Sequence, residues 1–314
     1  MAFSASINNE NVFPIITLSD TSTGTNAELY SFGALLNQFN INTEKATFNI
    51  IEGFASPQDA IANITNGFKS AFLSPFTCRM NEGKYAFDGT AYQVEKFFMP
   101  PHAIHGIVFD AVYAIAETQS TDTFASVTFT HNYKKEDAGY PFSYSIKHVW
   151  KLEAGNKLSV TTTVQHDNNN TIPYAQGWHP YFTLGGNVDD LSIQFTTDKQ
   201  VEFDNTLLPT GATISDERFK EGASLKDVFL DNCFHLSGKE QHFCVLKNDT
   251  LKLTISPSAA YPYLQIYTPP HRKSIAIENL SGAPDCFNNG LGLLKLLPNE
   301  PKTFATTYSV TLLN

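Results

Sequence analysis

The sequence predicts an all-β protein built as one large antiparallel β-sandwich. Short runs rich in Phe, Tyr, Val, Ile and Thr recur from one end of the chain to the other, and these residue types favour pleated strands. Clusters of Gly, Pro, Asn and Asp separate the runs and mark turns. Helix signals are few and short. Together these observations favour sheets packed on sheets over any helical architecture.

One short surface helix is predicted at residues 56–60. Ser56 suits the N-cap position, Pro57 suits the first turn, and Asp59 complements the positive end of the helix dipole. No other segment carries so complete a start signal.

The clearest strands lie in the second half of the chain. Several of them alternate apolar and polar residues with period two, which places one face of the strand on a core. The predicted ranges are 124–133, 142–152, 158–166, 191–195 and 251–256. No Gly/Ser linker, compositional break or fixed-period repeat divides the chain, so we predict a single domain over residues 1–314.

The net charge of the chain limits the classes of molecule that it is expected to bind. The formal net charge is -10 and the acidic residues are spread along the chain, which disfavours nucleic acid because phosphate neutralisation needs clustered Lys and Arg. The N-terminus has no basic segment followed by an apolar run, and no apolar window approaches membrane-spanning length. We therefore expect a soluble, cytoplasmic protein with a small-molecule partner and no membrane partner.

The cysteines carry no recognisable motif. Cys78, Cys233, Cys244 and Cys286 are scattered without a CxxC pair, which indicates neither a disulfide framework nor a thiolate metal site. They are predicted to be reduced thiols.

Three stretches combine ionisable groups with rigid or aromatic surroundings. They are residues 100–106 with His102 and His105, residues 177–186 with His179, and residues 274–279 with Glu278. Glu278 ends an apolar run, so a strand can deliver it to a partly desolvated site where its pKa rises toward that of a useful base. The alternative for Glu278 is a strand end in solvent.

His179 also has two interpretations. It is either a satisfied histidine packed against Trp178 and Tyr181, or a group that acts on a ligand. Aromatic faces beside a hydrogen-bonding group also suit a pyranose, whose C–H faces pack on rings while its hydroxyls seek hydrogen bonds. Sugar binding is therefore compatible with this stretch.

Other kinds of chemistry find little support. His102 and His105 lie three positions apart, as metal ligands on a helix do, but the prolines before them oppose a helix and no further His or Cys pair completes a set. We predict no metal and no cofactor. The chain has no Gly-x-Ser-x-Gly and no phosphate-binding glycine motif. What remains is proton transfer on a small molecule, or binding alone.

The order of the motifs resembles the aldose 1-epimerase (galactose mutarotase) family over most of the chain. The resemblance is carried by residues 29–36, 51–54, 78–89, 105–106, 179–184, 230–234 and 265–268, and by Glu278. It implies a β-sandwich of the galactose mutarotase-like (supersandwich) type with few short helices. It also implies an isomerase of carbohydrate metabolism, which interconverts the α and β anomers of a free hexose or pentose and is a monomer or homodimer.

Each site residue takes its implied role from the matching family position. Glu278 is the implied base, His179 the general acid, His105 a hydrogen-bonding group near the ring oxygen, and Arg79, Asp231 and Gln265 the ligands of sugar hydroxyls. A non-catalytic carbohydrate-binding protein is the main alternative. A hydrolase or lyase is the second, and it would need a further catalytic carboxylate, for which Asp231 is the candidate.

Four positions depart from the family pattern. Cys78 and Thr183 each stand where the family has asparagine, His102 where it often has asparagine, and Ile107 where it has a second glycine. All four adjoin matched residues, so we expect them to bear on which sugar fits. The acidic chain with no evident basic cluster disfavours a phosphosugar.

Overall fold

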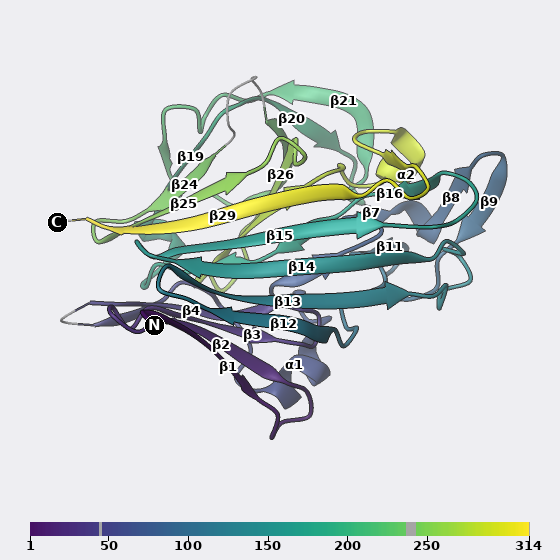
Figure 1. Cartoon of the computed structure of the whole chain (residues 1–314). Coiled ribbons are helices and arrows are strands. Elements are labelled where there is room, and N and C mark those ends of the chain that lie inside the picture. Colours follow the sequence, from purple (N-terminus) through teal and green to yellow (C-terminus); the bar gives the residue numbers. More distant parts are fainter. Residues whose placement is uncertain (44–45, 237–242, 314) are drawn as a thin grey trace.

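The structure, a computed structural model, describes residues 1–43, 46–236 and 243–313. Strands dominate these residues and the helices are short, so the all-β prediction is confirmed (Figure 1). Two large antiparallel sheets, which we call the long-strand sheet and the cavity sheet, form the two layers of the sandwich within the described residues.

The long-strand sheet contains the strands that the sequence predicts most clearly, and in Figure 1 its strands run side by side across the molecule. Its order is β12 (Ala114–Ser120), β13 (Phe124–Tyr133), β14 (Tyr144–Glu153), β15 (Lys157–Gln165), β29 (Lys302–Leu312), β25 (Leu251–Pro257), β24 (Cys244–Lys247), β19 (Ser192–Phe195) and β22 (Ala223–Ser224). All five predicted strands lie here. β13 has the predicted bounds, and the other four differ from theirs by one or two residues at an end.

The cavity sheet is built from shorter strands. Its order is β21 (Pro209–Ser215), β20 (Thr197–Phe203), β23 (Asp231–Leu236), β26 (Tyr263–Tyr267), β27 (Ile275–Leu280), β17 (Gly177–His179) and β6 (Ala71–Leu73), with β18 (Tyr181–Phe182) also paired to β27. β27 is buried at every position. A strand buried on both faces lacks the apolar–polar alternation of a half-buried strand. In β27, three apolar residues, Ile275 to Ile277, accordingly follow one another before Glu278.

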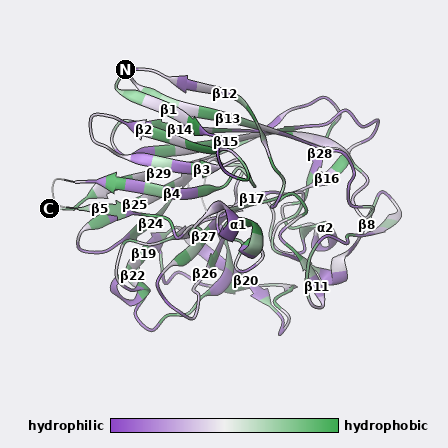
Figure 2. Cartoon of the chain, turned by 90° about the horizontal axis from the view of Figure 1, so that it is seen from below, coloured by the Kyte–Doolittle hydropathy of each residue, from purple (hydrophilic) through white to green (hydrophobic). Residues whose placement is uncertain are grey.

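Aromatic side chains join the two sheets. Trp178 of β17 lies 5.4 Å from Trp150 of β14 and 4.9 Å from His148 of the same strand, measured between ring centroids. Phe182 of β18 packs on Tyr308 of β29 at 5.5 Å. Figure 2 shows hydrophobic and hydrophilic residues alternating along several strands, as expected when one face of a strand meets a core.

The remaining elements surround this sandwich. They are β1 (Phe3–Asn8), β2 (Ile15–Asp20), β3 (Asn26–Tyr30), β4 (Leu36–Asn42), β5 (Thr47–Asn49), β7 (Arg79–Met80), β8 (Lys84–Phe87), β9 (Thr90–Gln93), β10 (Phe98–Met99), β11 (His102–Ile104), β16 (Ile172–Tyr174), β28 (Leu294–Leu296), the 3-10 helices η1 (Asn81–Gly83) and η2 (Val188–Asp190), α1 (Pro57–Asn63) and α2 (Cys286–Asn289). One core cluster runs from Phe3 to Val310. This continuity supports the single domain over residues 1–314, which stays a prediction.

The predicted helix is confirmed as α1. Ser56 is its N-cap and accepts a hydrogen bond from the backbone N–H of Asp59 at 3.1 Å, and Pro57 occupies the first turn. The helix extends to Asn63, three residues beyond the predicted end. Within the described residues, no helix has the length and apolar character needed to cross a membrane.

Candidate active site

One cavity of about 330 Å³ is lined by all six predicted site residues. They are Arg79, His105, His179, Asp231, Gln265 and Glu278. The sequence reasoning did not identify most of the other wall residues, which include Phe68, Met99, Phe203, Leu207 and Tyr267. An aromatic or aliphatic residue that lines a cavity has no local signature separating it from one in the core.

Strand register brings several of these residues onto one face. Gln265 of β26 pairs directly with Glu278 of β27, and Cys233 of β23 pairs with Gln265. Directly paired residues of antiparallel strands share a face, and so do residues two apart on one strand. Asp231 therefore joins them from β23. The pairing of Gly177 with Leu280 adds His179 of β17 to the same face.

His179 and Glu278 form a buried pair. Nε2 of His179 lies 3.3 Å from Oε1 of Glu278, and their side chains are 6% and 2% exposed. Among the described residues, His179 Nδ1 and Glu278 Oε2 have no hydrogen-bond partner. The alternative that Glu278 is a strand end in solvent is wrong. His179 does pack on Tyr181, at 5.0 Å between ring centroids, but it also contacts a carboxyl group.

Burial shifts the pKa values of Glu278 and His179 in opposite directions. It raises the pKa of Glu278 well above its usual value, with Asp231 adding to the rise and Arg79 opposing it. Burial also lowers the pKa of His179 to about 4. Desolvation penalises the charged form of each group. Between these two pKa values the pair therefore holds one proton, which lies on one partner or the other.

His105 is held beside this pair. Its backbone N–H donates to the carbonyl of Cys78 at 2.9 Å, and its ring lies 4.9 Å from the ring of His179 and 4.6 Å from that of Phe68. Burial, followed by the neighbouring His179 and Arg79, lowers the pKa of His105 well below its usual value. A neutral imidazole can donate from one nitrogen and accept at the other.

Asp231 and Gln265 form the polar wall of the cavity. Nε2 of Gln265 donates to Oδ1 of Asp231 at 2.8 Å, whereas Oε1 of Gln265 has no partner in the described part of the chain. Burial raises the pKa of Asp231, while Arg79 and the Gln265 hydrogen bond oppose the rise. A free amide oxygen beside a carboxyl group suits ligand hydroxyls, which can donate to both.

Gly106 fixes the backbone that carries His105. Both residues have positive φ, 64° for His105 and 77° for Gly106. A Cβ at Gly106 would lie 2.2 Å from the carbonyl oxygen of Ser74 and 2.5 Å from its nitrogen. Glycine is required here because main-chain atoms fill the space that a side chain would take.

Gly106→Ala is therefore expected to destabilise the fold by more than about 3 kcal/mol. Gly89→Ala is the matched control, because Gly89 has a similar φ of 78° with no atom within 4 Å of its Cβ position. The control should cost only about 1 kcal/mol. Urea unfolding of both variants measures the difference, and equal losses would show that the contact with Ser74 is unimportant.

The four departures from the family pattern lie in different places. Cys78 lines the cavity. His102, on β11, accepts a hydrogen bond at Nδ1 from the backbone N–H of Glu82 at 3.2 Å, Ile107 is a core residue, and Thr183 lines a separate groove. Of the four, Cys78 alone lines the cavity, and the expectation that all four bear on which sugar fits stays a prediction.

The cysteines are free, as predicted, and all are buried. Cys78 is the one with neighbours of interest. It groups with His105 and Glu278, the one set of three or more metal-ligating side chains that the described residues bring together. The sequence pointed instead to His102 and His105 as the metal alternative, since spacing along the chain gave no link to Cys78 or Glu278.

The fold and the cavity define a β-sandwich protein that holds a buried acid–base pair beside hydrogen-bonding side chains. Residues 14–309 match the aldose 1-epimerase family. The chain belongs to this family, so the resemblance seen in the sequence is confirmed.

Relatives and solved structures agree with this assignment. The uncharacterized protein YihR of Escherichia coli K12 is 27% identical over 236 residues, covering 73% of this chain and 75% of that protein. Human galactose mutarotase is 24% identical over 260 residues, covering 77% and 71%. Two crystal structures share the fold: galactose 1-epimerase from Lactobacillus acidophilus, with TM-score 0.84, 20% identity and coverage of 99% and 98%, and a galactose mutarotase-like protein from Clostridium acetobutylicum, with TM-score 0.86, 17% identity and coverage of 99% and 98%.

Proposed function

We propose that this protein is an active aldose 1-epimerase that interconverts the α and β anomers of a free aldose. The observation that carries the proposal is the buried contact of 3.3 Å between His179 Nε2 and Glu278 Oε1 inside the cavity. Binding alone does not require an acid–base pair taken out of water. A pair with oppositely shifted pKa values is the arrangement that general acid–base catalysis uses.

The reaction needs one proton removed and one supplied. The shifted pKa values favour the pair's proton on Glu278, and its transfer to His179 gives the reactive arrangement. In that arrangement the Glu278 carboxylate takes the proton of the anomeric hydroxyl, and the His179 imidazolium gives a proton to the ring oxygen as the bond between C1 and that oxygen breaks. The open aldehyde turns about C1–C2, and the reverse steps close the ring on the other face. Both oxygens are bonded to C1, so neighbouring acid and base groups are suitably placed for both.

The rest of the cavity suits a neutral sugar. Gln265 and Asp231 offer acceptors for hydroxyls, Arg79 offers donors, and the aromatic walls offer faces for C–H groups. The lining formed by the described residues contains one arginine and no lysine, together with two carboxyl groups. This favours a free aldose, hexose or pentose, over a phosphorylated one. The monomer or homodimer expected from the resemblance stays a prediction.

Polarimetry on freshly dissolved α-anomers of free hexoses and pentoses tests the proposal. We expect at least one sugar to reach anomeric equilibrium faster with the protein than without it. A sugar that binds while its anomers equilibrate at the uncatalysed rate would instead identify a carbohydrate-binding protein. Release of a sugar from a glycoside would identify a hydrolase, with Asp231 as its second carboxyl group.

The activity is expected to have a bell-shaped pH profile. At low pH, as His179 with its pKa of about 4 becomes protonated while Glu278 keeps its proton, the pair holds two protons and has no base. As the pH rises through the raised pKa of Glu278, the pair loses its remaining proton and has no acid. The pH dependence of kcat/KM gives the two apparent pKa values of the pair. A flat profile would contradict the pairing.

A further inference from the structure

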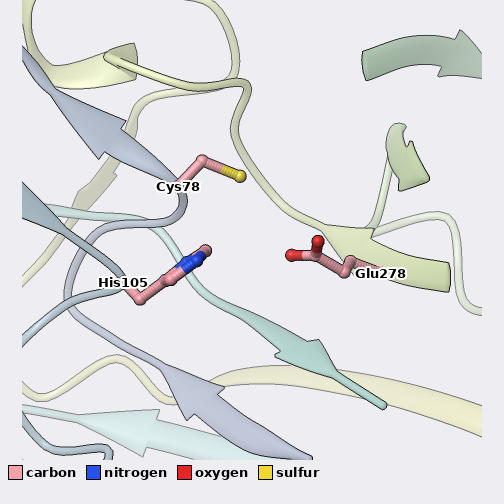
Figure 3. A group of neighbouring side chains, drawn as sticks. All are labelled: Cys78, His105 and Glu278. Carbon is pink, nitrogen blue, oxygen red and sulfur yellow. The ribbon is translucent and has the colours of Figure 1, made fainter. Parts of the chain in front are cut away.

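Three side chains of different chemistry converge in the cavity. Cys78 lies just before β7, His105 just after β11, and Glu278 on β27. Figure 3 shows the thiol, the imidazole and the carboxyl group pointing toward a common space. One donor atom from each lies within 4.8 Å of the other two, and all three residues are buried.

Two of these groups have unused hydrogen-bonding capacity. His105 Nδ1 and Glu278 Oε2 are buried without a hydrogen-bond partner in the described ranges. Buried polar atoms are ordinarily paired, so unpaired ones that line a cavity are free to bind a ligand there. A sugar accounts for hydroxyl partners at the histidine and the carboxyl group. It gives no account of a thiol beside them, since sulfur is a weak hydrogen-bonding atom.

Sulfur, imidazole nitrogen and carboxylate oxygen together are the donors that zinc accepts in proteins, whereas Mg²⁺ and Ca²⁺ prefer oxygen alone. We propose that Cys78, His105 and Glu278 bind one Zn²⁺ ion in this cavity and that the bound ion excludes the sugar. The fourth coordination position faces the cavity and is filled by water, as in zinc sites with three protein ligands.

The charges of the proposed site balance. Zinc binding releases two protons to solvent, that of the Cys78 thiol and the one held by the His179–Glu278 pair. The thiolate and the Glu278 carboxylate then neutralise the two charges of the ion. A neutral cluster avoids the high free energy of an unpaired charge in a buried cavity. Zinc bonds of roughly 2.0–2.3 Å place ligand atoms about 3.3–3.8 Å apart. The donors lie within 4.8 Å of one another, so they must approach by at most about 1.5 Å.

The inhibitory consequence rests on the proposed function. Zinc would bind the carboxylate that removes the anomeric proton and the histidine beside the ring oxygen. One ion would therefore both prevent Glu278 from acting as the base and fill the space that the sugar needs. Zinc binding itself does not depend on that function. Cys78 is the cavity-lining departure from the family pattern, and it is the residue that adds sulfur to the site.

Competition of the full-length protein with a chromogenic zinc chelator measures the binding. We expect one Zn²⁺ per chain, with affinity reduced more than about 100-fold in Cys78→Ala, since losing even a partner of a metal ligand weakens binding by roughly 10–100-fold. Cys244→Ala is the matched control, because it removes a buried thiol from β24 of the other sheet. Cys78→Ser is the second variant, and thermal unfolding confirms that each variant is folded.

Cobalt provides an independent readout. Co²⁺ added to the protein should give the near-ultraviolet absorption of a thiolate–metal bond in wild type and Cys244→Ala, and not in either Cys78 variant. Equal zinc affinity in wild type and folded Cys78→Ala, or cobalt absorption that survives Cys78→Ser, would overturn the proposed site.

The ratio of mutarotation rates with and without Zn²⁺ separates the two proposals. Inhibition in wild type that is relieved in Cys78→Ala supports both. Binding that depends on Cys78 in a protein inactive on every sugar leaves the metal site standing and defeats the proposed function. Binding without inhibition of an active enzyme overturns the claim that zinc excludes the sugar.

Discussion

Glu278→Gln is expected to lower catalysed anomer interconversion by roughly 10²–10⁴-fold, the usual size of a general-base contribution. The amide keeps the shape of the side chain and can still contact His179, but it cannot take the anomeric proton. Polarimetry on the best α-anomer measures the loss in kcat. Glu117→Gln, at an exposed position of β12, is the matched control and should leave the rate unchanged. Near-normal activity of Glu278→Gln would eliminate this residue as the base.

The same substitution is expected to stabilise the fold above neutral pH, by about 1–3 kcal/mol. The pKa of Glu278 is raised in the folded state, so its contribution to stability is full below the unfolded pKa and is lost as the pH rises through the folded pKa. The neutral amide avoids this loss. Thermal unfolding of wild type and variant at acidic and alkaline pH should show an advantage that grows with pH. A variant less stable at every pH would indicate a structural role for Glu278.

His179→Gln is expected to reduce kcat by a similar factor of roughly 10²–10⁴, because no imidazolium is then available to protonate the ring oxygen. KM should change less than kcat, since the role assigned to His179 is exercised mainly in the transition state. His235→Gln, at an exposed position of β23, is the matched control. A variant that changes only KM would show that His179 binds the sugar without donating a proton.

Combining the two substitutions tests whether the groups act as a unit. The double variant Glu278→Gln with His179→Gln is expected to be little slower than either single variant, because residues that act together are strongly non-additive. Losses that multiply would indicate two independent contributions. This comparison uses rates alone and needs no assignment of the individual pKa values.

The strands of the long-strand sheet were the most predictable part of the fold. Apolar and polar residues alternate in 124–133 and 251–256, and β13 and β25 begin where predicted. A strand with one face on the core needs this alternation, because successive side chains point to opposite faces. The cavity sheet was harder to predict. Its central strand β27 is buried throughout, so it lacks the alternation that marks a half-buried strand.

The candidate site was predictable as a set of residues and unpredictable as a geometry. Local pattern drew attention to His105, His179 and Glu278. Family order then added Arg79, Asp231 and Gln265. Thr183 lines another groove, a placement that the sequence did not indicate. The association of Cys78 with His105 was missed because it arises from the loops that adjoin β7 and β11, which pair in the structure.

By itself, the sequence determined the all-β class and the capped helix α1, because these are properties of local pattern and residue type. The acid and base candidates followed from the order of motifs that the chain shares with its family. The tertiary structure alone decided that His179 and Glu278 meet at 3.3 Å in a buried cavity and that Cys78 lies beside them. The physical reason is strand register. Pairing between strands distant in the chain selects which side chains share a face, and burial at that face then shifts their pKa values.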